Sequence, residues 1–288
     1  MEEINYWIWI SKIKSLGSVK IQKLLEIYKE PKKIFELKKQ NLLKLQWLTE
    51  KNINEILDIR YRKNLEKEKN KLKKQNVSLI TIKDTEYPIN LQQIYDKPIC
   101  LYVKGNKENL NQFSLGMIGC RENSSYGKQV AETIAKSLVK NNIITISGLA
   151  KGIDSISHKA TILANGKTIA VIGSGLDFIY PYENINLANE IIKRGGTIIS
   201  EYPLGTKPSK LNFPARNRII SGISSGIIVI EAKKKSGTMI TVDFALEQGK
   251  NVFTVPRKYN KYKFRRNKWI DKARRKMYNL YARYIRRI

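Results

Sequence analysis

The chain has 288 residues, and its 54 Lys and Arg against 25 Asp and Glu give a formal net charge of +29 and an isoelectric point near 10.0. This length suits one large or two medium domains, and the charge favours a polyanionic partner, either nucleic acid or an anionic membrane surface. No apolar run approaches the roughly 20 residues that cross a bilayer, and the two cysteines, Cys100 and Cys120, form neither a disulfide framework nor a metal-ligand cluster.

Ile, Asn and Lys dominate the whole chain, so charge alone is a weak indicator of function. The first residues lack the basic and apolar regions of a signal peptide. The simplest expectation is therefore a soluble cytoplasmic protein.

Residues 1–76 are expected to form a helical domain, because apolar residues such as Ile21, Leu24 and Leu25 recur at helical spacing. Residues 16–21 resemble the turn and second-helix start of a helix-hairpin-helix unit, and residues 46–53 resemble a degenerate second copy. Such a turn can hold a DNA phosphate through backbone N–H groups. Gly17 alone is a thin signal, so an ordinary helical bundle is the simpler interpretation. Residues 60–76 are expected to form one charged, solvated linking helix.

From residue 77 strands and helices are predicted to alternate. The expected strands cover residues 77–82, 99–103, 115–119, 143–147, 168–172, 197–200, 226–230 and 251–255, and the expected helices cover residues 126–141, 152–165, 184–194, 215–223 and 237–249. Short strands that are apolar on both faces are typical of a mostly parallel sheet covered by helices. The predicted fold class is α/β, a doubly wound sheet whose ligands lie at the carboxyl ends of its strands.

Three strand-to-helix turns contain glycine and are candidates for anion binding, because such turns aim backbone N–H groups at phosphates. Gly119 and Arg121 follow the first strand of the parallel part, and Ser147 and Gly148 follow the next. Residues 236–238 form the third turn. Arg121 is interpreted as a phosphate contact, with a structural carboxylate pair as the alternative.

The segment 212–218 combines an aromatic residue, two Arg and an Asn, which suits stacking on bases and gripping a backbone. Phe213 is interpreted as a base-stacking residue in a turn before Pro214, and the alternative is that it closes a small core there. Of Arg216, Asn217 and Arg218, two are expected to face the ligand while the third anchors the loop.

Catalytic and metal sites are not expected. His158 is the only histidine and should bond locally on the helical face that it shares with Asp154, which is interpreted as a helix cap. Residues 172–176 only resemble a nucleophile elbow, and there is no Gly-x-Gly-x-x-Gly or Walker lysine motif. No cofactor is therefore predicted.

The segment 257–288 carries fourteen Lys and Arg against one Asp, interleaved with Tyr, Phe and Trp. Basic residues mixed with aromatics suit single-stranded nucleic acid. A poorly packed basic tail is the alternative, and both interpretations stay open.

Residues from about 80 to 256 resemble the DNA-processing protein A family, also called DprA or Smf. The matching blocks lie in the family's order, at residues 118–121, 147–154, 179–184, 200–203, 212–218 and 236–241. The N-terminal helices resemble the SAM-like helix-hairpin-helix module of many members. The resemblance implies an extended Rossmann fold that binds single-stranded DNA, forms a homodimer and loads the RecA recombinase onto incoming strands during natural transformation.

The resemblance also assigns roles by position. Arg121 and the turn at Ser147 and Gly148 match the phosphate-holding groups, and Lys210 and Phe213 match the basic contact and the stacking aromatic. The residues expected to bind DNA are Gly119, Arg121, Ser147, Gly148, Lys151, Lys210, Phe213, Arg216, Asn217, Arg218, Ser236, Gly237 and Thr238.

Two departures from the family pattern stand out. Cys120 replaces the usual Ser or Thr, which removes one hydroxyl contact but is expected to leave the backbone N–H groups of the turn. Arg257 replaces a typical Gly, and the tail that follows departs from the family where its dimer and RecA surfaces lie. The expected domains are therefore residues 1–76, 77–256 and a divergent tail, 257–288.

The alternative from another class is an enzyme similar to Rossmann-fold phosphoribohydrolases, whose mark is Pro-Gly-Gly-x-Gly-Thr-x-x-Glu. The corresponding turn here, residues 233–241, lacks the Gly pair and the catalytic Glu. A degraded copy that binds DNA nonspecifically is a third possibility, favoured by the altered tail. The sequence predicts a recombination mediator without catalytic activity.

Overall fold

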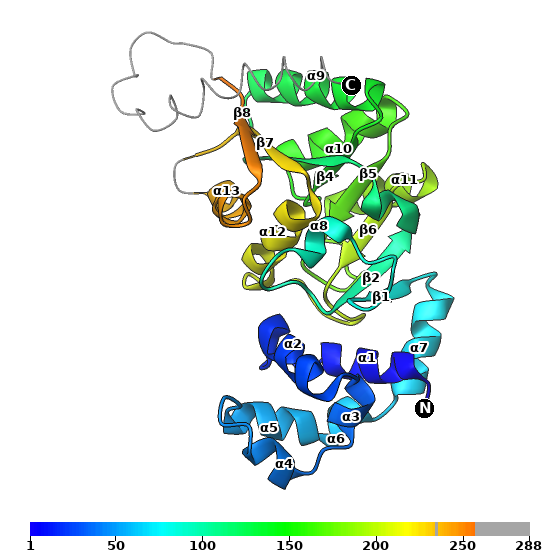
Figure 1. The fold of residues 1–288 in the computed structure, drawn as a ribbon. Helices are drawn as coiled ribbons and strands as arrows, with labels where there is room; N and C mark the ends of the chain where they lie inside the picture. Colours follow the sequence, from blue (N-terminus) through cyan, green and yellow to red (C-terminus); the bar gives the residue numbers. More distant parts are fainter. Residues whose placement is uncertain (234–235, 257–288) are drawn as a thin grey trace.

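The computed structural model describes residues 1–233 and 236–256, and it shows a helical domain below an α/β domain (Figure 1). The predicted tail, residues 257–288, lies outside the described residues. The helical domain contains α1 (Glu3–Ser11), α2 (Gly17–Tyr28), α3 (Pro31–Phe35), α4 (Lys39–Leu43), α5 (Glu50–Leu57), α6 (Ile59–Arg62) and α7 (Leu65–Lys74).

Both segments that resemble helix-hairpin-helix turns lie at helix starts. Gly17 opens α2 with a φ of +61°, a conformation that favours glycine. Thr49 caps α5: its side chain accepts a hydrogen bond from the Asn52 N–H, and the Asn52 side chain accepts one from the Thr49 N–H. The two expected helix starts are therefore present.

The single linking helix expected over residues 60–76 is wrong, because Asn64 adopts a left-handed conformation (φ 64°) between α6 and α7. The helix α7 is also not fully solvated. Lys69 is buried and pairs with Glu2 and Glu66, each at 2.7 Å. The pair with Glu2 attaches α7 to the start of the chain beside α1.

The α/β domain is built on one eight-stranded sheet in the order β1-β2-β6-β5-β4-β3-β7-β8. Its strands are β1 (Ser78–Thr81), β2 (Cys100–Gly105), β3 (Ser114–Gly119), β4 (Ile144–Ser147), β5 (Thr168–Val171), β6 (Thr197–Ser200), β7 (Gly226–Glu231) and β8 (Asn251–Thr254). The strands from β3 to β8 pair in parallel, whereas β2 pairs antiparallel with both β1 and β6. The predicted mostly parallel doubly wound sheet is confirmed.

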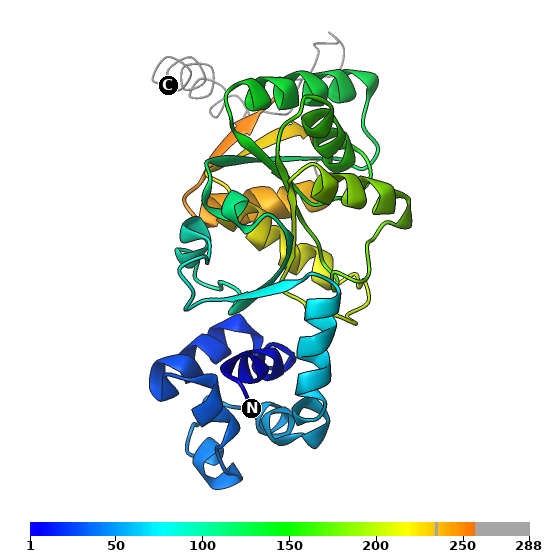
Figure 2. The same cartoon turned by 90° about the vertical axis from the view of Figure 1, so that its right-hand side faces the viewer.

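The remaining elements are α8 (Ile89–Gln92), η1 (Lys107–Asn111), α9 (Ser125–Lys140), α10 (Ile153–Leu163), η2 (Tyr182–Asn184), α11 (Ile185–Lys193), α12 (Asn212–Ile223) and α13 (Gly237–Glu247). Alternate residues of one strand pack on opposite layers: Met117 contributes to a core with α9 and α10, and Ile118 to a core with α8, α12 and α13. Figure 2 shows helices on both faces of the sheet.

The helix α12 begins at Asn212, three residues before the expected start. Phe213 and Pro214 therefore lie in its first turn rather than in a preceding loop, a position where proline loses no hydrogen bond. This correction fixes the direction of the Phe213 side chain relative to Arg216 and Asn217.

The helical domain packs directly on the α/β domain. Trp7 and Trp9 share one hydrophobic core with Tyr102 of β2, and the Ser11 and Tyr102 hydroxyls lie 2.8 Å apart. Within the described residues, no helix is both long and apolar enough to cross a membrane.

Candidate nucleic-acid interface

A groove of about 650 Å³ opens where β3 and β7 end and α12 and α13 begin. Its walls include nine of the residues that were expected to bind DNA, namely Gly119, Arg121, Lys210, Phe213, Arg216, Asn217, Ser236, Gly237 and Thr238. The expected position at the carboxyl ends of the strands matches this groove. Four expected residues, Ser147, Gly148, Lys151 and Arg218, do not line it.

Two buried, oppositely charged groups form the floor of the groove. The Arg216 guanidinium donates hydrogen bonds to the carbonyl oxygens of Gly148, at 2.6 Å, and Val171. Burial lowers its pKa to about 10, although the Asp154 charge opposes this shift. Burial also raises the pKa of Asp154, with the Arg216 charge acting in the opposite direction. Arg216 thus ties two strand ends together beneath the surface.

Gly148 has no space for a side chain. A Cβ there would lie 2.6 Å from an Arg216 nitrogen and 2.7 Å from Asp154 Oδ2. Asp154 does not cap α10 as expected. Its Oδ2 instead accepts hydrogen bonds from the N–H groups of Gly148 (3.2 Å) and Ala150 (3.4 Å). An internal carboxylate therefore occupies the N–H groups of the turn that was predicted to hold a second phosphate.

The turn after β3 is occupied in a similar way. The Cys120 N–H donates to the Glu231 carbonyl oxygen at 2.8 Å, and the Ser124 N–H donates to Glu231 Oε2 at 2.9 Å. The expectation that the backbone N–H groups of this turn remain for phosphate is wrong at Cys120. The carboxylate also lies at the positive end of α9, where it takes the place of an external anion.

The other cations of the groove are exposed, in contrast to the buried Arg216. Arg121 and Lys210 are exposed and form no ion pair within the described part of the chain. Lys233 also lines the groove, but its ammonium pairs with the exposed Glu122 at 2.9 Å. Exposed pairs of this kind are weak and exchange easily for a phosphate. The side chains of Arg121 and Lys210 are therefore the groups most available to an anionic ligand.

The start of α13 is the one predicted anion-binding turn without an internal carboxylate among the described residues. Ser236 occupies the N-cap without a side-chain cap, and the first turn contains no acidic residue. Asn217 donates to the Gly237 carbonyl oxygen at 3.3 Å, which connects α12 to α13 across the groove.

Aromatic rings lie along one side of the groove. Phe213 packs against Gly173, where a Cβ would lie 3.1 Å from the ring, and it is half-buried. Its other neighbour is Tyr180, with ring centroids 5.5 Å apart and planes inclined by 32°. Tyr180 lines the groove but was not among the expected site residues; its block, residues 179–181, was the available signal.

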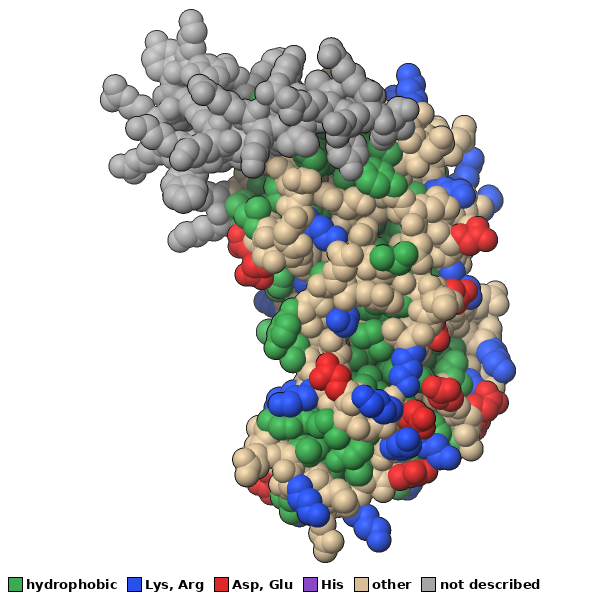
Figure 3. Space-filling view, in the orientation of Figure 1, with side chains coloured by type: hydrophobic (Ala, Val, Ile, Leu, Met, Phe, Trp, Pro, Cys, Tyr) green, Lys and Arg blue, Asp and Glu red, His purple; other side chains and the backbone are tan. Residues whose placement is uncertain are grey.

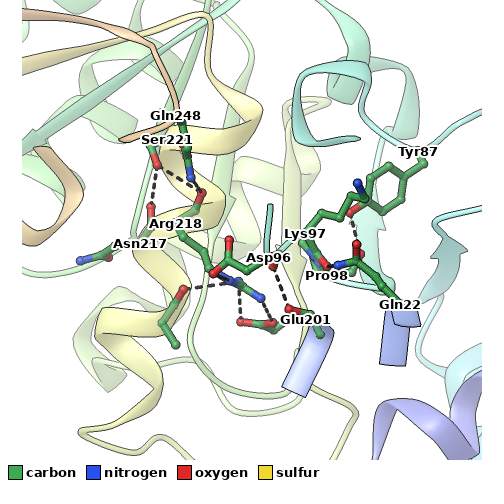
Figure 4. Close-up of polar contacts among 12 residues, drawn as sticks. Gln22, Tyr87, Asp96, Lys97, Pro98, Glu201, Asn217, Arg218, Ser221 and Gln248 are labelled. Atoms are coloured by element: carbon green, nitrogen blue, oxygen red, sulfur yellow. Dashed lines mark hydrogen bonds and ion pairs between the residues drawn. The ribbon is translucent and has the colours of Figure 1, made fainter. Parts of the chain in front are cut away.

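Arg218 has a different environment from Arg216. Figure 4 shows its guanidinium between two carboxylates, bidentate to Glu201 (3.0 and 2.7 Å) and 3.0 Å from Asp96. The backbone carbonyl oxygens of residues 96 and 97 in turn accept hydrogen bonds from Ser18 and Gln22 of α2. Arg218 thus has the anchoring position expected for one of the three polar residues, and it anchors α12 near the helical domain.

The remaining polar groups lie inside the fold or outside the groove. The buried Ser147 hydroxyl donates to the Met117 carbonyl oxygen at 2.6 Å, and Lys151 pairs with Glu183 at 2.7 Å on the surface. His158 does not bond on its own helix as expected; its Nδ1 contacts the Thr168 hydroxyl of β5 at 2.7 Å.

On the face shown in Figure 3, Lys and Arg side chains are spread widely, and Asp and Glu side chains lie among them. The location of a candidate site therefore depends on the grouping of Arg121, Lys210, Phe213 and Tyr180 around one concave surface.

Comparisons with known proteins identify the relatives of this chain. The family described as DNA recombination-mediator protein A matches residues 78–281. The DNA processing protein DprA of Bacillus subtilis is 45% identical over 185 residues, which cover 64% of this chain and 62% of that protein. Protein Smf of Escherichia coli is 40% identical over 195 residues, which cover 68% and 52%. The matched segments thus span less than two thirds of these curated relatives.

Solved structures of DNA processing protein A are also similar to this chain. The X-ray structure of DNA processing protein A from Streptococcus pneumoniae has a TM-score of 0.74 and 35% identity, covering 91% of this chain and 89% of that one. A Helicobacter pylori DNA processing protein A structure, described as giving insight into a single-stranded DNA binding mode, has a TM-score of 0.58 and 33% identity and covers 64% and 83%.

Proposed function

The chain belongs to the DNA recombination-mediator protein A family, and we propose that it binds single-stranded DNA in the groove between α12 and α13. The observation that carries the proposal is the placement of exposed Arg121 and Lys210 beside the rings of Phe213 and Tyr180. Cations that hold phosphates beside aromatic rings that stack on bases are the two components of single-strand binding. The similarity to the Helicobacter pylori protein supports the same ligand.

The occupied turns support a polymer rather than a mononucleotide. In nucleotide-binding Rossmann folds, the helix start after a strand receives the phosphates. Here Glu231 lies at the start of α9 and Asp154 occupies the turn before α10. Side chains along an open groove are left to contact the ligand, which suits a strand that crosses it.

The proposal includes a role in recombination. The protein acts without cofactor or catalysis, as a homodimer that loads RecA onto incoming single strands during natural transformation. This part rests on the family and on the named relatives. It places the protein in the cytoplasm, where its cysteines remain thiols. A RecA-loading assay on single strands coated with single-strand-binding protein tests it, and failure to displace that protein would contradict it.

Fluorescence anisotropy tests the binding step. At about 150 mM salt, roughly the physiological value, the protein should bind a labelled single strand more tightly than the duplex of the same sequence, and equal affinities would contradict the proposal. Arg121→Ala and Lys210→Ala should each lower the log–log salt slope by about 0.7, since each removes one phosphate contact. Lys193→Ala, an exposed residue of α11 outside the groove, is the matched control and should leave the slope unchanged.

A further inference from the structure

Tyr180 lies in the connection between β5 and α11, beside the groove rather than inside a core. Tyr180 is 42% exposed. The centroids of the Tyr180 and Phe213 rings lie 5.5 Å apart, and the ring planes are inclined by 32°. A second tyrosine, Tyr182, is 64% exposed and meets Tyr180 edge-on at 6.1 Å. Burial of either aromatic ring would be favourable, so two neighbouring rings that remain this exposed suggest a surface that a ligand covers.

The environment of Phe213 limits what that ring can do alone. The Gly173 backbone closes one side, and Tyr180 is its aromatic neighbour along the groove. Both rings line the groove, so a strand in it meets two neighbouring aromatic rings. Stacking on aromatic faces does not depend on base identity, so each ring can take a successive base of one strand.

A cation lies beyond Tyr180. Lys151 pairs with Glu183 at 2.7 Å, and this hydrogen bond and charge raise the pKa of Lys151, with a smaller contribution from the nearby Tyr180. Both partners of the pair are well exposed, so the pair is weak and Lys151 can turn to a phosphate. Lys151 was expected to bind DNA from the sequence. It does not line the groove, but its chain neighbour Ala150 and Tyr180 do.

We propose that Tyr180 is a second base-stacking residue and that the single strand continues from the groove over Tyr180 toward Lys151. This inference rests on the proposed single-strand binding. It assigns one additional nucleotide to the site, next to the Lys151–Glu183 pair outside the groove.

The test compares Tyr180→Ala, Tyr180→Leu and Tyr180→Phe, with Tyr95→Ala as the control, because Tyr95 is 81% exposed and lies outside the groove. Oligothymidines of increasing length are titrated by anisotropy. Tyr180→Ala and Tyr180→Leu should weaken binding of long oligonucleotides by roughly 5- to 150-fold, as expected for one lost stack. Tyr180→Phe and Tyr95→Ala should remain within about twofold of wild type. Tyr180→Leu fills most of the space of the ring, so it separates lost stacking from a packing defect.

Two further measurements separate stacking from mere support of Phe213. Tyr180→Ala should still weaken binding several-fold in the Phe213→Ala background, although the two effects are coupled because the rings are neighbours. The shortest oligonucleotide that reaches full affinity should be one nucleotide shorter for Tyr180→Ala. Loss of the Tyr180 effect in the Phe213→Ala background, or wild-type affinity of both Tyr180→Ala and Tyr180→Leu, would overturn the inference while leaving the proposed function intact. Absence of single-strand binding by the wild type would instead overturn the proposed function.

Discussion

His158 should make the stability of the folded chain depend on pH, because its imidazole is buried and neutral. The Thr168 hydroxyl donates its only hydrogen to the Thr145 carbonyl oxygen at 2.7 Å, so His158 Nδ1 must donate to Thr168 and carries the proton. The other nitrogen, Nε2, is buried without a partner among the described residues. Burial, and then the Arg216 charge, lower the pKa of His158 from 6.5 to about 3.

The direction of the pH effect on stability follows from proton linkage. Between pH 6.5 and about 3 the unfolded chain binds a proton at this histidine that the folded chain does not bind, so stability falls as the pH is lowered through this window. From pH 7 to pH 5 the loss is about 2 kcal/mol. The raised pKa of Asp154 acts in the opposite direction, since the folded state then binds its proton more readily. A comparison of the wild type with a His158 variant removes the Asp154 contribution, because both proteins share it.

Urea unfolding followed by circular dichroism at pH 7, 6 and 5 measures the effect. His158→Asn keeps a polar group near Thr168 and does not titrate, so its loss of stability over this range should be smaller by about 2 kcal/mol. Ser157→Ala, on the same helix and equally buried, is the control and should follow the wild-type pH dependence. Parallel curves for wild type and His158→Asn would refute the reasoning. Since His158 is the only histidine, no other imidazole can mask the result.

Three further substitutions test whether a residue binds DNA or stabilises the fold. Phe213→Ala should cost about 1–3 kcal/mol of DNA affinity with little change in salt slope; much earlier thermal unfolding with normal affinity would instead make it a packing residue. Arg218→Met removes the guanidinium partner of Glu201, whose side chain is only 15% exposed, so urea unfolding should show a loss of about 3–5 kcal/mol. An unchanged stability would contradict the anchoring role. Gly148→Ala should push Arg216 out of place, costing about 1–3 kcal/mol of stability and weakening DNA binding, and a variant that matches wild type in both assays would show that the floor can adapt.

The sheet could be predicted well because its strands carry a local signal. Residues 144–147 and 168–171 are buried at every position, and short runs that are rich in β-branched residues are typical of a covered parallel strand. All eight expected strands are present within two residues at each end. The start of α12 was placed three residues late, because Pro214 was interpreted as part of a loop although proline fits the first turn of a helix.

The different roles of Arg216 and Arg218 were only partly predictable. Residues two positions apart on an α-helix are rotated by about 200° about its axis, so the two guanidiniums cannot both face one ligand. That rule separates them, but it does not say which one faces the groove. The choice depends on Glu201 and Asp96, which come from other parts of the chain and reach Arg218 only in the folded protein.

The same limit applies to the turns that carried the strongest phosphate signal in the sequence. A glycine turn after a buried strand indicates free N–H groups only if no internal carboxylate reaches them, and neither Glu231 nor Asp154 could be assigned this position from spacing alone. With those groups occupied, the side chains of Arg121 and Lys210 and the start of α13 are left to hold the ligand. Binding through side-chain cations releases counterions in proportion to their number, whereas binding through backbone N–H groups does not. The salt slope is therefore the measurement that distinguishes side-chain cations in this groove from a phosphate-binding turn.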